Sequence, residues 1–341
     1  MTPSQIMKSI SLASDLAKPS TLPILSHLVI GNNQVVASDI DSQITIKAPF
    51  DFEPYTVPAA KFKGILATLA DVPMALTHKD GKLSIKSGRS KFTCPTLPSE
   101  DFPMMEIGDV TATIQMDQST LKNMLHTAQH AIPNADVRAI LNGALLDFNG
   151  SELSVVGTDG FRMAWTTTPI ESSPVEAVIP HRAVQRIIKL LDDGPVTLSF
   201  YEGKLSLTTD TIEFITKLVS GKYPNWRRII PKNPNQVQID IELLKETINR
   251  ASTVLHKVRS ARITIKDTFA VECSNNGELA SDDFPIQWAH EEYVTGMNPD
   301  YLRDALSVMP GDEITLHIGS PTTAWLMESA GVRAVVMPLR N

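Results

Sequence analysis

Lysine follows glycine at Lys82, Lys204 and Lys222, and this dipeptide is part of a phosphate-binding P-loop. A P-loop also needs a serine or threonine directly after the lysine, because that hydroxyl holds magnesium. Leucine, leucine and tyrosine stand there instead. The sequence therefore gives no support for nucleotide hydrolysis.

His126 and His130 are one helical turn apart, a spacing at which two histidines can share a metal ion. The glutamate of a His-Glu-x-x-His motif is missing, and no third ligand is evident, so an exposed helical face is the better interpretation. Thr158-Asp159-Gly160 contains a candidate catalytic aspartate, but Ser38-Asp39 occupies the equivalent place earlier in the chain. A turn after a strand explains both segments. We therefore expect no enzyme activity, no metal and no cofactor, and we interpret the chain as a binding protein.

Composition limits the class of protein further. The chain has 341 residues, of which 42% are hydrophobic and 20% charged, as in globular proteins of two or three domains. No apolar run approaches the ~20 residues that a membrane helix needs, and residues 1–12 do not resemble a secretory signal. Two distant cysteines, Cys94 and Cys273, exclude a disulfide framework and fit the reducing cytoplasm.

The elements that position any binding surface recur three times along the chain. Gly81-Lys82-Leu83-Ser84-Ile85 returns as Gly203-Lys204-Leu205-Ser206-Leu207, an offset of 122 residues. Each repeat also has two apolar patterns of helical spacing, one near its start and one in its middle. These patterns predict helices at residues 3–18, 58–70, 117–132, 180–191, 240–255 and 298–309.

Short runs rich in Val, Ile, Leu and Thr lie between the helices. Three of them predict hairpins, with turns at residues 31–33, 149–150 and 266–267. Each repeat thus reads helix, strands, helix, strands, an α+β fold. Linkers rich in Pro, Asn and Gly divide the chain into predicted domains at residues 1–110, 111–231 and 232–341.

Charge is distributed unevenly between helices and the rest of the chain. The net charge is −7, but the six predicted helices carry +4 and the remainder −11. Arg182, Arg186 and Lys189 lie on the helix face opposite Val184 and Ile187. An ordinary solvated helix face also has this appearance. The alternative is nucleic acid bound through its phosphates, without sequence preference.

Motifs along the whole chain resemble those of the bacterial DNA polymerase III sliding clamp, or β subunit, family. They are Thr21-Leu22-Pro23-Ile24-Leu25, Ser87-Gly88-Arg89-Ser90-Lys91-Phe92, Leu97-Pro98-Ser99-Glu100-Asp101-Phe102-Pro103, Val137-Arg138, Leu141-Asn142-Gly143, Thr158-Asp159-Gly160-Phe161-Arg162, Lys217-Leu218-Val219, Tyr223-Pro224-Asn225-Trp226-Arg227-Arg228 and Val335-Val336-Met337-Pro338-Leu339-Arg340.

The resemblance implies three repeated domains, each with two helices backed by β-sheet. Two chains would form a head-to-tail dimeric ring, a homodimer with the helices lining the hole. Double-stranded DNA would thread this ring, and the clamp would hydrolyse nothing. A clamp-like decoy or regulator, which binds clamp partners without encircling DNA, is the alternative function. The DNA-facing residues expected on this basis are Lys63, Lys122, Arg138, Arg182, Arg186 and Lys189.

The resemblance also implies a groove for partner peptides and an interface between the two chains. The expected partners are the DNA polymerase III catalytic subunit, the clamp loader, and other polymerases and repair proteins. The expected groove residues are Leu141, Thr158, Gly160, Phe161, Arg162, Met163, Pro224, Arg228, Ile229, Val335, Val336, Met337, Pro338, Leu339 and Arg340. The expected dimer-interface residues are Phe92, Cys94, Val254 and Leu255.

The sequence departs from the family in four features. Phe161 stands where the family usually has histidine, so one groove wall is more apolar here. The chain ends in Asn341, where an apolar residue is common, and the third repeat is short. The strand that usually precedes the first helix is not evident in residues 1–5.

Overall fold

The computed structural model describes residues 1–256 and 259–339. It divides into two compact units, which are described separately. Unit 1 comprises residues 1–120 and 189–218, and unit 2 comprises residues 121–188 and 219–341. Each unit contains one eight-stranded antiparallel sheet and one smaller sheet.

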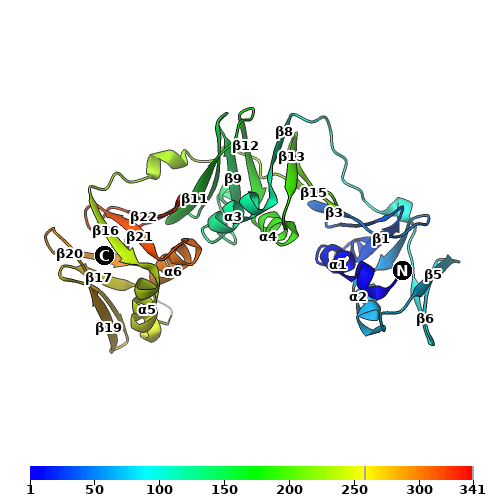
Figure 1. Ribbon diagram of the computed structural model, residues 1–341, viewed down its shortest axis with the longest axis horizontal. Coiled ribbons are helices and arrows are strands. Elements are labelled where there is room, and N and C mark those ends of the chain that lie inside the picture. Colours follow the sequence, from blue (N-terminus) through cyan, green and yellow to red (C-terminus); the bar gives the residue numbers. More distant parts are fainter. Residues whose placement is uncertain (257–258, 340–341) are drawn as a thin grey trace. The chain divides into compact units, whose positions relative to one another are not determined.

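Six α-helices occur in the described residues, and all six predicted helices are confirmed, each shorter than predicted. Side chains that accept backbone N–H bonds fix two of the starts: Asp240 accepts from Leu243 N at 2.7 Å, and Asn298 accepts from Asp300 N at 2.9 Å. The helices (Figure 1) are α1 Pro3–Ser14, α2 Ala59–Thr68, α3 Gln118–Gln129, α4 His181–Leu190, α5 Ile241–Ala251 and α6 Pro299–Val308. The 3₁₀ turns are η1 Pro23–Ser26, η2 Ser99–Asp101, η3 Ala139–Leu141, η4 Trp226–Ile229 and η5 Ser252–Val254.

The large sheet of unit 1 has the order β4-β1-β2-β3-β15-β14-β13-β8. The helices α1 and α2 contact each other, and α1 packs on β2 and β3. The smaller sheet has the order β5-β6-β7, so β7 is an edge strand. The strands are β1 His27–Gly31, β2 Gln34–Ser38, β3 Ser42–Lys47, β4 Tyr55–Pro58, β5 Met74–Lys79, β6 Lys82–Ser87, β7 Ser90–Pro95, β8 Ala112–Asp117, β13 Pro195–Tyr201, β14 Lys204–Thr208 and β15 Ile212–Lys217.

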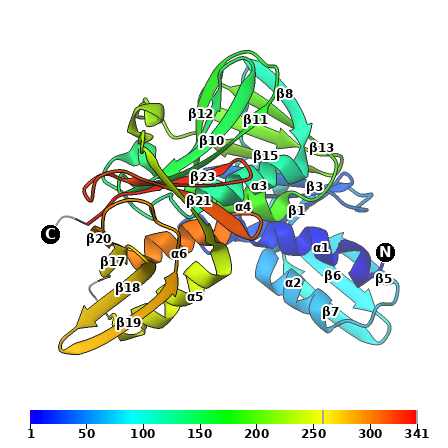
Figure 2. The same ribbon diagram turned by 60° about the vertical axis from the view of Figure 1, so that its left-hand side comes forward.

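The large sheet of unit 2 has the order β12-β9-β10-β11-β23-β22-β21-β16, and the smaller one β19-β18-β17-β20. The helices α5 and α6 lie side by side (Figure 2), and α5 also packs on β18 and β19. The strands are β9 Gly143–Phe148, β10 Glu152–Thr158, β11 Arg162–Pro169, β12 Val175–Pro180, β16 Asn235–Asp240, β17 Ala261–Ile265, β18 Thr268–Asn275, β19 Glu278–Pro285, β20 Tyr293–Met297, β21 Glu313–Ile318, β22 Trp325–Ser329 and β23 Val332–Val336.

The three predicted hairpins are confirmed as β1–β2, β9–β10 and β17–β18. Each large sheet takes strands from two sequence repeats, which the repeat pattern alone did not predict. In unit 1, β3 of the first repeat pairs with β15 of the second, and in unit 2, β11 of the second pairs with β23 of the third. The division into domains at residues 1–110, 111–231 and 232–341 stays a proposal.

Among the described residues, a strand precedes the first helix of the second and third repeats but not α1. The strands β8 and β16 run directly into α3 and α5 and pair with β13 and β21. At the equivalent place Met1 offers one carbonyl, which accepts a hydrogen bond of 3.0 Å from Met74 N. A single bond thus replaces a strand pair at the start of the chain.

Close packing of α3 on β10 depends on Gly157. A Cβ atom at this position would lie 2.2 Å from the carbonyl oxygen of Ala128, which belongs to α3. Because a backbone oxygen in a helix cannot move alone, the helix itself would have to shift away from the sheet.

We predict that Gly157→Ala lowers the free energy of unfolding by about 1–3 kcal/mol through overpacking. Gly64→Ala is the matched control, because a Cβ at Gly64 of α2 would meet nothing within 4 Å. In a helix interior this change is expected to stabilise by about 0.5–1 kcal/mol. Urea unfolding followed by circular dichroism measures both, and an unchanged midpoint for Gly157→Ala would contradict the packing argument.

Candidate functional site

The turn between β10 and β11 projects an aromatic side chain into solvent. The Thr158 hydroxyl donates to the carbonyl of Arg162 at 2.7 Å, and Asp159 Oδ1 accepts from the backbone N–H groups of Phe161 and Arg162 at 2.8 and 2.9 Å. Gly160 has φ +88°, a conformation that suits glycine. The predicted turn is confirmed, and it holds Phe161 with 63% of its surface exposed.

Arg162, the last residue of this turn, ties β11 to α6. Its guanidinium pairs with Asp159 Oδ2 at 3.1 Å and with Asp304, and it lies 4.4 Å from the centre of the Tyr301 ring. Only 14% of its side chain is exposed. Arg162 therefore fixes the turn against α6, and it is not a free cation at a rim.

His130 lies close to this ion pair, just beyond the end of α3. Both of its ring nitrogens are buried without a hydrogen-bond partner. Burial, together with the nearby charge of Arg162, lowers the pKa of His130 to about 4. The interpretation of His126 and His130 as one exposed face is correct for His126 and wrong for His130, because both ring nitrogens of His130 are buried.

Arg138 supports the same turn from the outside. It forms hydrogen bonds of 2.9 and 2.8 Å to the two carboxylate oxygens of Asp136 and one of 2.9 Å to the carbonyl of Asp159. These hydrogen bonds hold the pKa of Asp136 at about 2. A Cβ at Gly160 would come within 3.0 Å of the Arg138 guanidinium, so glycine also allows this approach. A DNA contact by Arg138 stays a prediction.

Buried apolar residues form a floor beneath the turn. Leu141, Met163 and Val335 belong to one core cluster, together with Tyr223 and Trp226. Thr158 and Val336 are buried as well. These five predicted groove residues therefore expose almost no area of their own, and Val336 belongs to the other core cluster, which includes residues of α5 and α6.

The end of the chain is brought beside the turn by strand pairing. Arg162 pairs with Val336 in the β11–β23 register, and Met337 N donates to the carbonyl of Phe161 at 2.9 Å. Leu339 N then donates to the carbonyl of Gly296 at 2.8 Å. Met337 and Leu339 are exposed, and Pro338 is half-buried. Arg340 and Asn341 lie outside the described residues.

The turn η4 supplies a further exposed apolar residue over the same core cluster. Trp226 anchors η4, because its ring is buried and its Nε1–H donates to Asp147 Oδ2 at 3.0 Å. Ile229 is 51% exposed, and Pro224 and Arg228 are exposed too. We call Phe161, Ile229, Met337 and Leu339 the apolar surface.

Sequence reasoning predicted the last strand of the third repeat at this site but missed three supporting residues of the same repeat. Tyr301 and Asp304 on α6 hold Arg162, and Gly296 on β20 holds Leu339. No motif marks them, because each is an ordinary residue of a helix or strand that only the fold brings close.

The other predicted DNA-facing residues lie on helices, and the predicted dimer-interface residues lie on the edge strand β7 and at η5. Arg182, Arg186 and Lys189 lie on α4, away from its buried residues, while Lys63 and Lys122 lie half-buried on α2 and α3. Phe92 and Cys94 lie on the edge strand β7, with Cys94 buried. Val254 is half-buried in η5, and Leu255 is buried in the core cluster of its own unit. Their DNA and dimer roles stay predictions.

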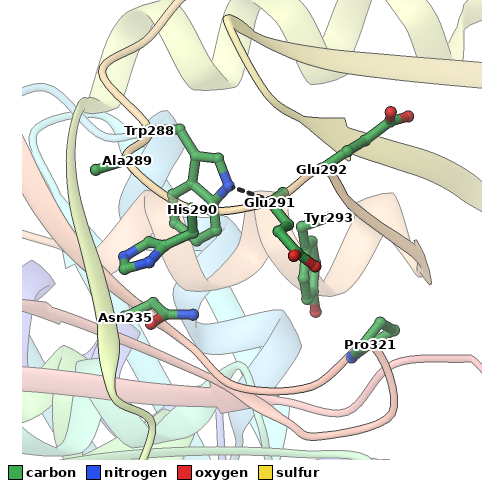
Figure 3. Close-up of a pocket in the computed structure, with 8 residues that line it drawn as sticks. All are labelled: Asn235, Trp288, Ala289, His290, Glu291, Glu292, Tyr293 and Pro321. Atoms are coloured by element: carbon green, nitrogen blue, oxygen red, sulfur yellow. Dashed lines mark hydrogen bonds between the residues drawn. The ribbon is translucent and has the colours of Figure 1, made fainter.

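A separate hollow lies beside the loop that precedes β20 (Figure 3). Its volume is about 490 Å³, and Trp288 Nε1–H donates to the carbonyl of Glu291 at 2.8 Å within its wall. None of the predicted groove residues lines it. The lining residues are Asn235, Trp288, Ala289, His290, Glu291, Glu292, Tyr293 and Pro321.

Among residues 1–256 and 259–339, no group of three His, Cys, Asp or Glu side chains is placed to hold a metal ion. No described helix is long and apolar enough to span a membrane.

Comparison with known proteins gives one result along the whole chain. The family models of the DNA polymerase III beta subunit match at residues 2–106 for the N-terminal domain, 115–225 for the central domain and 227–340 for the C-terminal domain. The beta sliding clamp of Salmonella typhimurium is 30% identical, with 94% of this chain and 93% of the relative covered. That of Escherichia coli K12 is 29% identical with the same coverage.

Solved structures agree. A sliding clamp of Pseudomonas aeruginosa bound to griselimycin has a TM-score of 0.95 at 27% identity, covering 100% of this chain and 98% of that one. The clamp of Bartonella birtlesii bound to the same compound has a TM-score of 0.94 at 27% identity, covering 100% and 99%.

The buried His130 predicts a loss of stability in mild acid. Its pKa is about 4 in the folded chain and 6.5 when unfolded, so stability is full above pH 6.5 and falls as the pH drops towards 4. The free energy of unfolding should be lower at pH 5 than at pH 7.5, by up to about 2 kcal/mol from this residue. His130→Met should remove that part of the difference, while His126→Met should retain it. Urea titrations at both pH values measure it, and equal pH dependence in wild type and His130→Met would contradict the assignment.

Proposed function

This chain belongs to the DNA polymerase III beta subunit family and is a DNA sliding clamp, and on that premise we propose that its protein partners bind at the apolar surface around Phe161. The observation that carries this proposal is the hydrogen bond from Met337 N to the carbonyl of Phe161, which places two exposed apolar side chains side by side. Exposed apolar groups gathered over a packed floor are typical of a protein-binding surface.

The partner is a short peptide with apolar anchors, as presented by a polymerase or a clamp loader. Phe161 offers a flat ring, and Met337 offers a flexible and polarisable thioether that adapts to different anchors. Burying one leucine or phenylalanine anchor contributes roughly 1.5–3 kcal/mol, so one or two anchors dominate the affinity of a short peptide. Peptide binding loses no conformational entropy by ordering this turn, because Asp159, Arg138 and Arg162 already hold it.

DNA is retained by topology and not by tight contact. Two chains close head to tail into a ring, and phosphates meet helix cations without a fixed register, which permits sliding. The clamp itself performs no catalysis, and a loader opens and closes it. The alternative of a decoy that does not encircle DNA has no observation in its favour.

Two edge strands have the complementary charges that ring closure requires. In unit 1, β7 is an edge strand, and the exposed residues around it are basic: Lys82, Lys86, Arg89 and Lys91. In unit 2, β19 is an edge strand, and Glu278 and Asp283 on it are exposed. Open edges invite pairing with another chain. We propose that β7 of one chain meets β19 of the other, with Phe92 and Val254 supplying apolar contact, since Cys94 and Leu255 are already buried within their own units.

The partner surface predicts a sharp loss of peptide affinity on small changes. Phe161→Ser, or deletion of residues 337–341, should weaken binding of a short fluorescent peptide containing leucine and phenylalanine by roughly tenfold or more, the loss of one anchor. Val72→Ser is the control, because Val72 is an exposed apolar residue of unit 1. Fluorescence anisotropy with the intact dimer measures it. Undiminished affinity in both variants would place the peptide site elsewhere.

The edge pairing predicts a result from mixing two variants. Lys86→Glu with Lys91→Glu should give monomers through like-charge repulsion, and so should Glu278→Lys with Asp283→Lys. An equal mixture should recover dimers, because one interface then joins the two altered edges and the other joins two natural edges. Size-exclusion chromatography with light scattering measures the oligomeric state, and Lys18→Glu with Lys47→Glu, two exposed lysines away from both edges, controls for total charge. A mixture that stays monomeric, or single variants that stay dimeric, would contradict this interface.

A further inference from the structure

The six helices divide sharply by charge. The first four, α1 to α4, contain no aspartate or glutamate, whereas α5 and α6 contain more acids than bases. The cations of α1 to α4 are Lys8, Lys61, Lys63, Lys122, Arg182, Arg186 and Lys189. The charged residues of α5 and α6 are Glu242, Lys245, Glu246, Arg250, Asp300, Arg303 and Asp304.

The cations of α5 are each held by a carboxylate of the same repeat. Lys245 pairs with Glu242 at 2.6 Å. Arg250 pairs with Glu246 at 2.9 Å and with Asp282 of β19 at 2.6 Å, and these two partners raise its pKa. The charge of α5 is therefore balanced within unit 2.

The group at α6 has two cations on one carboxylate, which offsets the two carboxylates around Arg250. Arg303 pairs with Asp300, which also pairs with Arg259 at 2.5 Å, and Arg303 further donates to Asn249 Oδ1 at 3.3 Å. The remaining acid of α6, Asp304, pairs with Arg162 under the apolar surface. On one face of the third repeat, each of these cations is thus paired with a carboxylate.

Such paired cations gain little from a phosphate. An exposed ion pair contributes only about 0–1 kcal/mol, so a phosphate can displace the carboxylate. The carboxylate is then left beside the phosphate and needs a counterion of its own. The ion released from DNA is offset by the ion taken up, and the net salt-dependent driving force is close to zero.

The helix α4 carries cations but no carboxylate. Arg182 is exposed on a helix without a single carboxylate, and Lys189 is exposed near its end. A phosphate that meets these side chains releases a counterion from DNA with no compensating uptake on the helix.

Resting on the sliding-clamp function, we propose that α4 supplies phosphate contacts to duplex DNA while α5 and α6 face it as a charge-balanced surface that does not hold it. The partner is the sugar–phosphate backbone of the duplex. The attraction for DNA phosphates is then interrupted at the third repeat of each chain. Fewer fixed contacts must therefore break as the DNA slides.

The test is the salt dependence of duplex binding by full-length dimers. Log K for a short fluorescein-labelled duplex is measured by anisotropy against log salt, from about 20 to 150 mM NaCl. Arg182→Gln with Lys189→Gln should flatten the slope by about 0.9 for each phosphate that α4 no longer neutralises. A fourfold change of α5 to Gln, at Glu242, Lys245, Glu246 and Arg250, removes two cations together with two of their carboxylates and should leave the slope unchanged.

A gain-of-contact variant completes the test. Glu242→Gln with Asp300→Asn frees Lys245, Arg259 and Arg303, and should steepen the slope. Circular dichroism and light scattering verify that every variant remains a folded dimer. If the α5 variant flattens the slope as much as the α4 variant, or the freed cations change nothing, the proposal is wrong while the clamp function stands. A wild-type dimer without salt-dependent duplex binding would overturn both.

Discussion

The pairing of β11 with β23 is the contact on which the partner surface depends. Five residue pairs, from Arg162 with Val336 to Thr166 with Val332, join strands that are about 170 positions apart in the chain. This ladder extends a four-stranded sheet of one repeat into an eight-stranded sheet shared by two. Its last step leads directly to the bond between Met337 N and the Phe161 carbonyl. The backbone therefore sets the distance between the two anchors, and their side chains remain free for a ligand.

Side-chain ties then lock the same junction. Arg162 uses its whole guanidinium within the protein, on Asp159, Asp304 and Tyr301. Because this cation is nearly buried, loss of both Asp159 and Asp304 would leave its charge uncompensated. The turn and α6 consequently behave as one body, and a peptide that binds Phe161 meets a surface that is already ordered. His130 lies beside this group and stays neutral there, first because burial disfavours its charged form and second because Arg162 is close.

Electrostatics and topology divide the work of a sliding clamp. A ring that held DNA through strong contacts on every helix would slide slowly, whereas one without any cation would gain nothing from the phosphate field. The proposed arrangement, with phosphate contacts on α4 and paired ions on α5 and α6, would place this chain between those limits. On the edge strand β19, Asp282 pairs with Arg250 of α5, whereas Glu278 and Asp283 are exposed.

Local pattern determined the elements. The 3.6-residue spacing of apolar side chains located all six helices, the hairpins followed from alternating strands around Asn-Gly and Lys-Asp turns, and Thr158-Asp159-Gly160 was identified as a turn from its residue types alone. The resemblance in motifs named the residues around Phe161 before any contact was known. Tertiary structure decided which of them are exposed: Met163 and Val335 are buried, while Met337 and Ile229 are exposed. It also decided that His130 is buried, that Arg162 belongs to α6, and that each large sheet crosses a repeat boundary. The physical reason is that periodicity records only which side of a helix or strand is apolar. The strand or helix that covers that side comes from a distant part of the chain, and it alone fixes the burial, partners and charge balance of each residue.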